Sequence, residues 1–354
     1  MTTAAREMTM SDAIAEATSM AMRRDPTIFV MGVGVDDPSG LFGTTRQPHD
    51  EFGDARVFDT PLSENCLTGM CVGAALTGSR PVLVHARVDF LLLTLDQLVN
   101  HAAKWSYMSG GALRVPLLVR AVVGRGWGQA AQHSQSLQSV VAHVPGIEVI
   151  MPSTPADAKG LLLSALTGSS PVVCIEHRWS HGVRGPVPED WYTIPIGRAA
   201  TVRTGGDVTI VAVSQMVGEA QRAATALESE GIHCEVIDLR SIRPWDVETV
   251  CDSVAKTRRL VVADTGWTHF GVTAEIAARV SSRLFGRLAA PVELVGLPDV
   301  PTPCAPKLEA AYYPAAADVI RAVKRTLTGG SAGGGEASAE GGTSPHAKPF
   351  QGAF

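Results

Sequence analysis

The chain has 354 residues and a formal net charge of −5, so it is long enough for two average domains and lacks the basic balance of a nucleic-acid-binding protein. Its first residues mix Arg6, Glu7 and Asp12 into an amphipathic pattern, without the apolar core of a signal peptide. The longest apolar run, residues 90–95, is far shorter than the roughly 20 residues that cross a bilayer. We therefore expect a soluble, cytoplasmic protein.

The first half of the chain alternates short apolar runs with helical patterns. Five runs have the length and composition of strands: residues 27–33, 80–86, 115–123, 147–152 and 171–177. Near-continuous apolarity is typical of strands that are buried on both faces of a parallel sheet. Helical patterns lie around them, at residues 11–23, 64–77, 93–109, 136–143 and 155–167. This βαβα order predicts a parallel sheet that is covered by helices on both sides.

The second half repeats the alternation. Strands are expected at residues 208–214, 234–240, 259–265 and 292–298, and helices at residues 216–229, 244–256, 273–284 and 315–326. The connector near residues 180–200 has several prolines and little periodicity, which indicates a domain boundary. We predict an α/β protein with two parallel-sheet domains, residues 1–190 and 191–328. A Gly-, Ala- and Ser-rich segment, residues 329–354, is expected to be a disordered tail.

Several common catalytic motifs are missing from the sequence. Gly32 and Gly34 follow the first predicted strand, but Asp37 occupies the position of the third glycine of GxGxxG, which argues against a dinucleotide site. The sequence contains neither a Walker loop nor a GxSxG elbow. None of its six cysteines forms a CxxC pair, so a zinc site or a redox dithiol is not indicated.

Three local features of the first domain remain as candidates. Glu64 begins a helical run of small residues after Ser63, so it is either part of a capped helix start or a functional acid. Phe90 follows a strand and is, taken alone, best explained as a core aromatic. His133 follows the glycine-rich loop 124–128, which is suited to close approach of a ligand, and is either an acid–base group or a surface histidine.

Five longer segments resemble one family, in the right order and over residues 8–328. They are FDTPLSE, DQLVNHAAKWSYMSGG, QHSQSLQSVVAHVPGIEVIMPSTPADAKGLL, VIDLRSIRPWD and GVTAEIAARV. The sequence resembles the beta subunit of the thiamine-diphosphate-dependent first component of 2-oxo acid dehydrogenase complexes, in the transketolase-like superfamily. The resemblance implies a pyrimidine-binding domain at residues 1–190 and a transketolase C-terminal domain at residues 191–328.

The resemblance also assigns roles to single residues. Glu64 matches the family glutamate that exchanges a proton with the pyrimidine ring of the cofactor, and it is expected to be buried for that purpose. Phe90 matches the aromatic residue that stacks on the pyrimidine, and Leu67 is expected to form an apolar wall beside it. His133 matches the histidine that is associated with acyl transfer to the lipoyl group.

The family further implies partners that this chain needs. The diphosphate and Mg²⁺ are held by an alpha subunit with a GDG motif, and GDG is absent from this sequence. We therefore expect an α2β2 heterotetramer that docks to a lipoyl-bearing acyltransferase core and acts on a small 2-oxo acid. The extra tail, residues 329–354, could hinder or replace that docking.

A structural potassium loop of the family corresponds to Ala165, Leu166, Gly168 and Ser170. Gly168 and Ser170 stand where the family usually has Asp and Asn, so we expect potassium to bind weakly or not at all.

Two other functions stay open from the sequence. One is a split transketolase-like or acyloin-forming carboligase, which uses the same cofactor with an aldehyde as acceptor. The other is a non-catalytic scaffold subunit, which the joint presence of Glu64, Phe90 and His133 opposes. The sequence does not identify the 2-oxo acid, because the residues that would select it are shared with the alpha chain.

Overall fold

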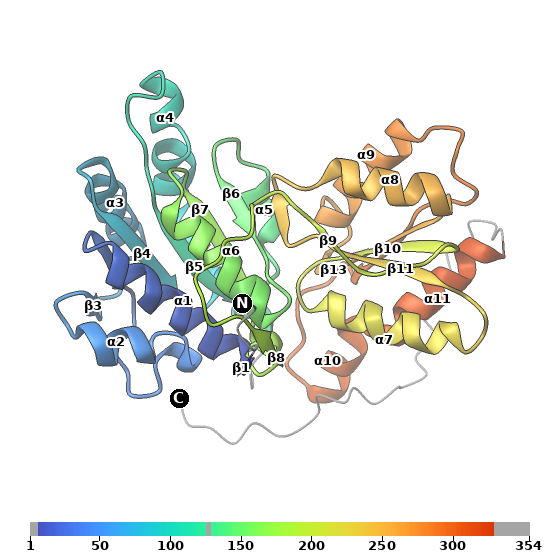
Figure 1. Cartoon of the computed structure of the whole chain (residues 1–354), viewed down its shortest axis with the longest axis horizontal. Helices are drawn as coiled ribbons and strands as arrows, with labels where there is room; N and C mark the ends of the chain where they lie inside the picture. Colours follow the sequence, from blue (N-terminus) through green and yellow to red (C-terminus); the bar gives the residue numbers. More distant parts are fainter. Residues whose placement is uncertain (1–5, 125–128, 329–354) are drawn as a thin grey trace. The chain divides into compact units, whose positions relative to one another are not determined.

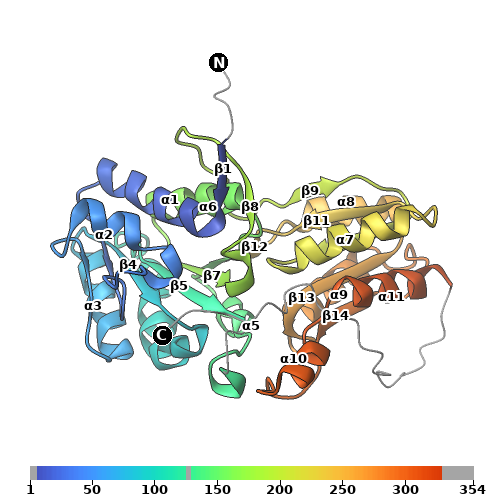
Figure 2. The same ribbon diagram turned by 90° about the horizontal axis from the view of Figure 1, so that it is seen from below.

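The computed structural model describes residues 6–124 and 129–328, which divide into two compact units (Figure 1, Figure 2). Among the described residues, the first unit is built from residues 6–123, 137–198 and 240–245, and the second from residues 124, 129–136, 199–239 and 246–328. The predicted tail, residues 329–354, lies outside the described residues. Among the residues described, none of the helices has the length and apolarity that crossing a membrane requires.

A seven-stranded sheet forms the centre of the first unit. Its order is β12-β6-β7-β5-β4-β2-β3, and all neighbours are parallel except β12 and β6. The strands are β2 (Ile28–Met31), β3 (Val57–Phe58), β4 (Arg80–His85), β5 (Leu118–Val123), β6 (Glu148–Ile150), β7 (Val172–His177) and β12 (Ser241–Arg243). A separate antiparallel ribbon joins β1 (Arg6–Thr9) to β8 (Arg184–Val187).

Helices cover both faces of this sheet. On one face, α1 (Met10–Arg24) and α6 (Pro155–Thr167) pack together over a core that includes Val30, Val84 and Cys174. On the other face, Cys71 of α3 (Glu64–Leu76) contacts Met31, whose side chain points away from that of Val30. The remaining elements of the unit are α2 (Arg46–Phe52), α4 (Trp105–Met108), α5 (Gln138–Ala142), η1 (Leu41–Gly43), η2 (Val88–Thr94), η3 (Gln97–Ala102) and η5 (Arg178–Ser180).

The second unit repeats this plan with five strands in the order β14-β13-β10-β11-β9. The strands are β9 (Ala200–Arg203), β10 (Val208–Ala212), β11 (Cys234–Asp238), β13 (Leu260–Trp267) and β14 (Glu293–Leu297). One face packs on α7 (Met216–Glu228) and α11 (Ala316–Leu327). On the other face, the Thr209 hydroxyl hydrogen-bonds Ser253 and Thr257 of α8 (Val247–Thr257). The unit also contains α9 (Val272–Arg283), α10 (Pro306–Tyr312) and η4 (Ala130–Gln132).

The predicted α/β class with two mostly parallel sheets is confirmed. What the sequence did not indicate is the antiparallel strand at one edge of each sheet, β12 in the first unit and β9 in the second. Such edge strands are common on otherwise parallel sheets, and they are too short and too mixed in composition to stand out as apolar runs.

The expectation of one long helix at residues 93–109 is wrong. This range instead contains the end of the 3₁₀ segment η2, the π-helical segment η3 and the short helix α4. Val88, Leu91 and Thr94 are buried at intervals of three residues, which matches the three residues per turn of a 3₁₀ helix. The N–H of Ala103 then donates to the carbonyl of Leu98, five residues back, at 3.0 Å. Packing against the sheet therefore favours 3₁₀ and π turns here over the 3.6 residues per turn of an α-helix.

A buried ion pair joins the central strands of the first unit. Arg120 of β5 donates from Nε and Nη2 to Glu176 of β7 at 2.5 and 3.0 Å, and His181 Nε2 lies 3.1 Å from the same carboxylate. The side chains of Arg120 and Glu176 are each only 1% exposed. Burial alone would raise the pKa of Glu176, but the charge of Arg120 and the hydrogen bonds from His181 and Arg120 lower it to about 2.

Replacing Arg120 with Met should destabilise the protein by about 3–5 kcal/mol at neutral pH, because it leaves the Glu176 carboxylate buried without its cation. Urea unfolding measures this change. Because the pKa of Glu176 lies below its ordinary 4.5 in the folded protein, its contribution is complete above pH 4.5 and is lost as the pH falls toward about 2. The cost of Arg120→Met should therefore shrink over that acid range.

The matched control is Arg46→Met, which breaks an exposed ion pair with Asp50 at 3.7 Å. Exposed pairs contribute about 0–1 kcal/mol, so this variant should unfold nearly as the wild type does. Equal losses in the two variants would contradict the importance assigned to the buried pair.

Candidate functional site

The carboxyl edge of the first sheet gathers the connecting segments that follow β2, β3 and β4. The chain turns away from β2 at Gly32, whose φ is +153°, and a Cβ there would lie 2.2 Å from the Val84 carbonyl oxygen of β4. Only glycine allows this approach. Two residues later, the Gly34 N–H donates to Asp59 Oδ1 at 2.7 Å, which ties the β2 loop to the segment before α3. The loop thus helps to fix where α3 begins.

Glu64 is the first residue of α3 and lies at this edge. Its side chain is partly exposed in the described chain, so the expected burial is not provided by this chain itself. Ser63 occupies the N-cap position, but its side chain makes no capping hydrogen bond among the described residues, so the simple structural explanation for this segment loses its main support. The helix dipole still favours a carboxylate at this position.

Phe90 and Leu67 lie on elements that pack against each other. Leu67 is buried one turn after Glu64, and Phe90 is a partly exposed residue of η2, which packs on α3. The Phe90 N–H donates to the Arg87 carbonyl at 3.2 Å and so holds the turn after β4. An accessible acid and an accessible aromatic ring on adjoining elements suit a flat nitrogen heterocycle, which stacks on the ring and accepts a proton from the acid.

Two buried charges beside Phe90 were missed by the sequence reasoning. Arg87 and Asp89 are only 4% and 7% exposed. The Arg87 guanidinium carbon lies 5.8 Å from the centroid of the Phe42 ring, and that of Arg178 lies 4.4 Å from the same ring. The signal was present in VHARVDF, where charged residues interrupt an apolar run, because burying charge is costly and occurs where it is needed.

His133 lies in a segment of the second unit, whereas Glu64, Leu67 and Phe90 lie in the first. Its side chain is exposed and directly follows η4. The residues after it are held in the second unit, because Ser136 Oγ donates to the Thr265 carbonyl at 2.5 Å and Thr302 Oγ1 donates to that of Ser134 at 3.3 Å. Residues 125–128 of the glycine-rich loop lie outside the described residues.

The predicted potassium loop has a guanidinium at two of its backbone carbonyls. The Leu166 and Gly168 carbonyl oxygens accept hydrogen bonds from Arg80 Nη1 at 3.1 and 2.7 Å. The Ser170 hydroxyl interacts with the Glu148 carboxyl group, and Ala165 has no side-chain oxygen. Potassium sites rely on oxygens that replace the hydration shell, and here two of the loop's carbonyl oxygens already accept hydrogen bonds from a cation. More broadly, the described residues contain no group of three His, Cys, Asp or Glu side chains suited to a metal ion.

Large apolar side chains are exposed on the elements around Glu64 and Phe90. Met70 of α3 is 59% exposed, and Leu92 and Leu93 of η2 are 42% and 57% exposed. Leu62, just before α3, is exposed as well. Grouped exposure of large apolar residues indicates an interaction surface rather than a surface made for water.

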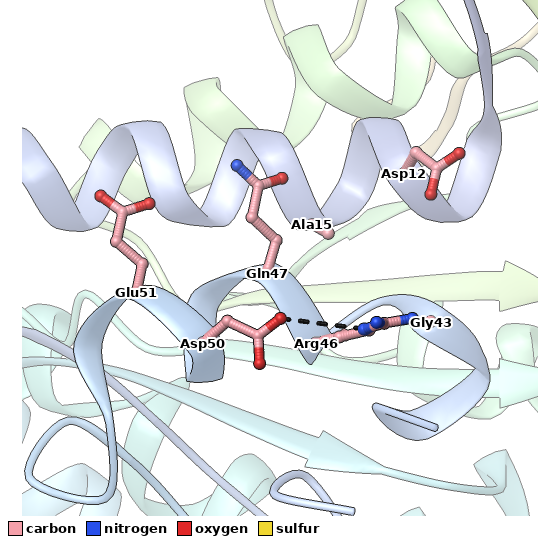
Figure 3. Close-up of a pocket in the computed structure, with 7 residues that line it drawn as sticks. All are labelled: Asp12, Ala15, Gly43, Arg46, Gln47, Asp50 and Glu51. Carbon is pink, nitrogen blue, oxygen red and sulfur yellow. Dashed lines mark ion pairs between the residues drawn. The ribbon is translucent and has the colours of Figure 1, made fainter. Parts of the chain in front are cut away.

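A hollow of about 510 Å³ between α1 and α2 is separate from these residues (Figure 3). It is lined by Asp12, Ala15, Gly43, Arg46, Gln47, Asp50 and Glu51. Its acids have partners, since Glu51 pairs with Arg23 and Asp12 accepts a hydrogen bond from Thr9. None of the site residues predicted from the sequence lines it.

Comparisons with known families place both units. Residues 6–182 match the transketolase pyrimidine-binding domain, and residues 197–319 match the transketolase C-terminal domain. The chain is 41% identical to the acetoin:2,6-dichlorophenolindophenol oxidoreductase subunit beta of Cupriavidus necator, over 92% of this chain and 99% of that one. It is 42% identical to the mitochondrial pyruvate dehydrogenase E1 component subunit beta of Bos taurus, over 92% of each chain.

Among solved structures, the chain resembles an inactive beta4 tetramer of a split-gene transketolase. The TM-score is 0.73 at 25% identity, and the match covers 91% of this chain and 98% of that one. A transketolase from Pichia stipitis, 16% identical with a TM-score of 0.64, shares the fold over 91% of this chain and 46% of its own.

Replacing Gly32 with Ala should destabilise the first unit by roughly 3 kcal/mol or more, because the new methyl group would collide with the β4 backbone at Val84. The control is Gly53→Ala, where φ is also positive at +61° but no atom lies within 4 Å of the added Cβ. That change carries only the backbone strain of roughly 1–2 kcal/mol. Urea unfolding of both variants compares them, and similar losses would mean that the close approach at Gly32 is unimportant.

Proposed function

The chain belongs to the transketolase-like family of beta subunits of thiamine-diphosphate-dependent 2-oxo acid dehydrogenases, and we propose that it decarboxylates a 2-oxo acid and passes the acyl group to lipoamide together with an alpha subunit. The observation that carries this proposal is the identity of 41–43% to such subunits over about 90% of the chain. The accessible acid and aromatic ring at the carboxyl edge of the first sheet support it.

In this proposal the residues of the first unit bind and orient the pyrimidine ring of thiamine diphosphate. Phe90 stacks on the ring, Leu67 closes one side of its pocket, and the Glu64 carboxyl group gives a proton to a ring nitrogen and takes it back. When bound, the cofactor supplies the nucleophilic carbon that attacks the substrate carbonyl. His133 would assist the transfer of the acyl group to the lipoyl thiol as an acid–base group.

The proposal includes partners that complete the site. An alpha subunit would hold the diphosphate and Mg²⁺ and cover Glu64, which is partly exposed in this chain. The exposed Met70 of α3 and Leu93 of η2 support a protein partner on this face. The assembly would be an α2β2 heterotetramer that delivers acyl groups to a lipoyl-bearing core. A cytoplasmic location belongs to the proposal and can be checked by cell fractionation.

A second substrate is favoured by a specific observation. Two relatives, from Cupriavidus necator and Bacillus subtilis, are acetoin:2,6-dichlorophenolindophenol oxidoreductase beta subunits, each 41% identical to this chain. Acetoin is a hydroxy ketone, so the bond that breaks next to the attacked carbonyl releases an aldehyde instead of CO₂. The same residues of this chain would serve both reactions. A split carboligase and a non-catalytic scaffold are not favoured by relatives at this level of identity.

Reconstitution tests the function directly. The chain, its alpha partner, thiamine diphosphate and Mg²⁺ should reduce a dye with a 2-oxo acid or with acetoin, and the chain without its partner should not. Glu64→Gln should lower turnover at least about 10²-fold, because an amide cannot exchange the proton, and it should leave the assembly intact. The matched control is Glu7→Gln, the same change on the exposed strand β1, which should retain full activity.

Turnover by the chain alone would overturn the requirement for an alpha subunit. Full activity of an assembled Glu64→Gln complex would favour the scaffold alternative. Size-exclusion chromatography separates loss of assembly from loss of chemistry.

His133→Ala should separate the two halves of the reaction. Dye reduction should stay within about 3-fold of the wild type, while acyl transfer to lipoamide should fall at least about 10²-fold, because only the second step uses the imidazole as an acid–base group. The control is His233→Ala, another exposed histidine of the second unit. Equal losses in the two assays would contradict the role given to His133.

A further inference from the structure

The connection between α6 and β7 is held by a side chain from β4. Arg80, the first residue of β4, sends Nη1 to the carbonyl oxygens of Leu166 and Gly168 at 3.1 and 2.7 Å. Its Nε lies 3.3 Å from Asp25 Oδ2 in the turn after α1. One guanidinium therefore joins the end of α6 to the turn that leads into β2.

This guanidinium occupies a fixed place. The backbone N–H of Arg80 donates to the Thr27 carbonyl at 3.0 Å, and Arg80 is the register partner of Ile28 in the parallel pair of β4 with β2. The Asp25 carboxylate that pairs with it is itself held by the Thr27 N–H at 2.8 Å and hydroxyl at 2.6 Å. The backbone of Arg80 and the carboxylate of Asp25 are thus both held by Thr27, which lowers the conformational entropy that the ion pair costs.

We propose that Arg80 is the built-in cation of the α6–β7 connection, so that this loop folds and holds β7 in place without a monovalent metal ion. The carbonyls at the end of a helix carry partial negative charge, which a positive group in the last turn stabilises. A guanidinium stabilises that charge with directed N–H donors, whereas a metal ion would need a shell of oxygens.

The surroundings of the loop oppose a monovalent metal ion on two grounds. A monovalent ion at the Leu166 and Gly168 carbonyls would lie within a few ångströms of the Arg80 charge and would be repelled by it. The loop also has few side-chain ligands for such an ion, because position 168 has no side chain and the Ser170 hydroxyl interacts with the Glu148 carboxyl group. The shell would have to be built from backbone carbonyls, two of which bind Arg80. The charge of Arg80 and the lack of side-chain ligands in the loop therefore both disfavour a monovalent ion.

Thermal unfolding of the purified chain at equal ionic strength in potassium, sodium and choline chloride tests the proposal. The wild type should give the same Tm in all three salts within about 1 °C. Arg80→Gln should lower the Tm by roughly 4 °C or more in every salt, because two carbonyl hydrogen bonds and one ion pair are lost. The matched control is Arg24→Gln, which removes an exposed arginine that stacks on Trp191 at 3.9 Å beside the same connection. It should change the Tm much less.

A wild-type Tm that rises by several degrees in potassium over choline would overturn the proposal, as would an Arg80→Gln variant as stable as the wild type. If Arg80→Gln does not fold, the salt comparison on the wild type still decides. Arg80→Lys keeps the charge but not the fork of donors, and its Tm should lie between those of the wild type and Arg80→Gln. These measurements need no turnover, so their outcome is independent of the proposed reaction.

Discussion

The common direction of β2, β3, β4, β5 and β7 is the constraint on which the candidate site depends. Because these strands are parallel, the segments that follow them all leave from one edge of the sheet, which is where ligands bind in open α/β sheets. Glu64 follows β3 and Phe90 follows β4, and they lie on the adjoining elements α3 and η2 although 26 positions separate them in the sequence. The close approach at Gly32 adds the β2 loop to the same edge.

Glu64 of the first unit is left partly exposed by the rest of the chain, and this exposure connects the site to the binding of a partner. A carboxyl group that exchanges a proton with a bound ring needs a surrounding that excludes water, since water competes for the same hydrogen bonds and weakens electrostatic interactions. In the described chain Glu64 is partly exposed, and large apolar residues such as Met70 and Leu93 lie exposed on the adjoining elements α3 and η2. A partner that buries those residues would also complete the environment of the acid. Activity and association are thus connected through one surface.

The class of the fold could be predicted from the sequence because fully buried strands appear in it as uninterrupted apolar runs. Runs such as VPLLVRAVV and PVVCIEH are apolar on both faces, and the structure places them side by side as β5 and β7. The same runs also contained Arg120 and Glu176. The register pairs Arg120 with Cys174, two residues before Glu176, and only this register shows that the two charges are diagonal neighbours on one face of the sheet. The register is set by packing across the whole sheet, so a pairing of this kind does not follow from either strand alone.

Prediction failed where the structure departs from ideal periods. Residues 93–109 have helical composition, but they do not form one α-helix. Burial at Val88, Leu91 and Thr94 matches the three residues per turn of a 3₁₀ helix, and the helix then widens to a π turn between Leu98 and Ala103. The site residues came from a resemblance of motifs, not from their pattern, because an acid at a helix start is ordinary by itself. The surroundings of Phe90 were missed, since Arg87 and Asp89 look like surface residues until the fold shows that they are buried.

The first unit uses internal arginines in two different ways, and the difference separates stability from function. Arg120 lies between the central strands, where it neutralises Glu176 in a place that water does not reach. Arg80 lies at the amino ends of the strands, opposite to the edge that carries Glu64. There it hydrogen-bonds two backbone carbonyls and pairs with the Asp25 carboxylate. At the amino ends of β4 and β7, Arg80 can hold the scaffold without taking part in chemistry at the carboxyl edge. Substitutions at Arg80 should therefore alter the stability of the unit, whereas those at Glu64 should alter its reaction.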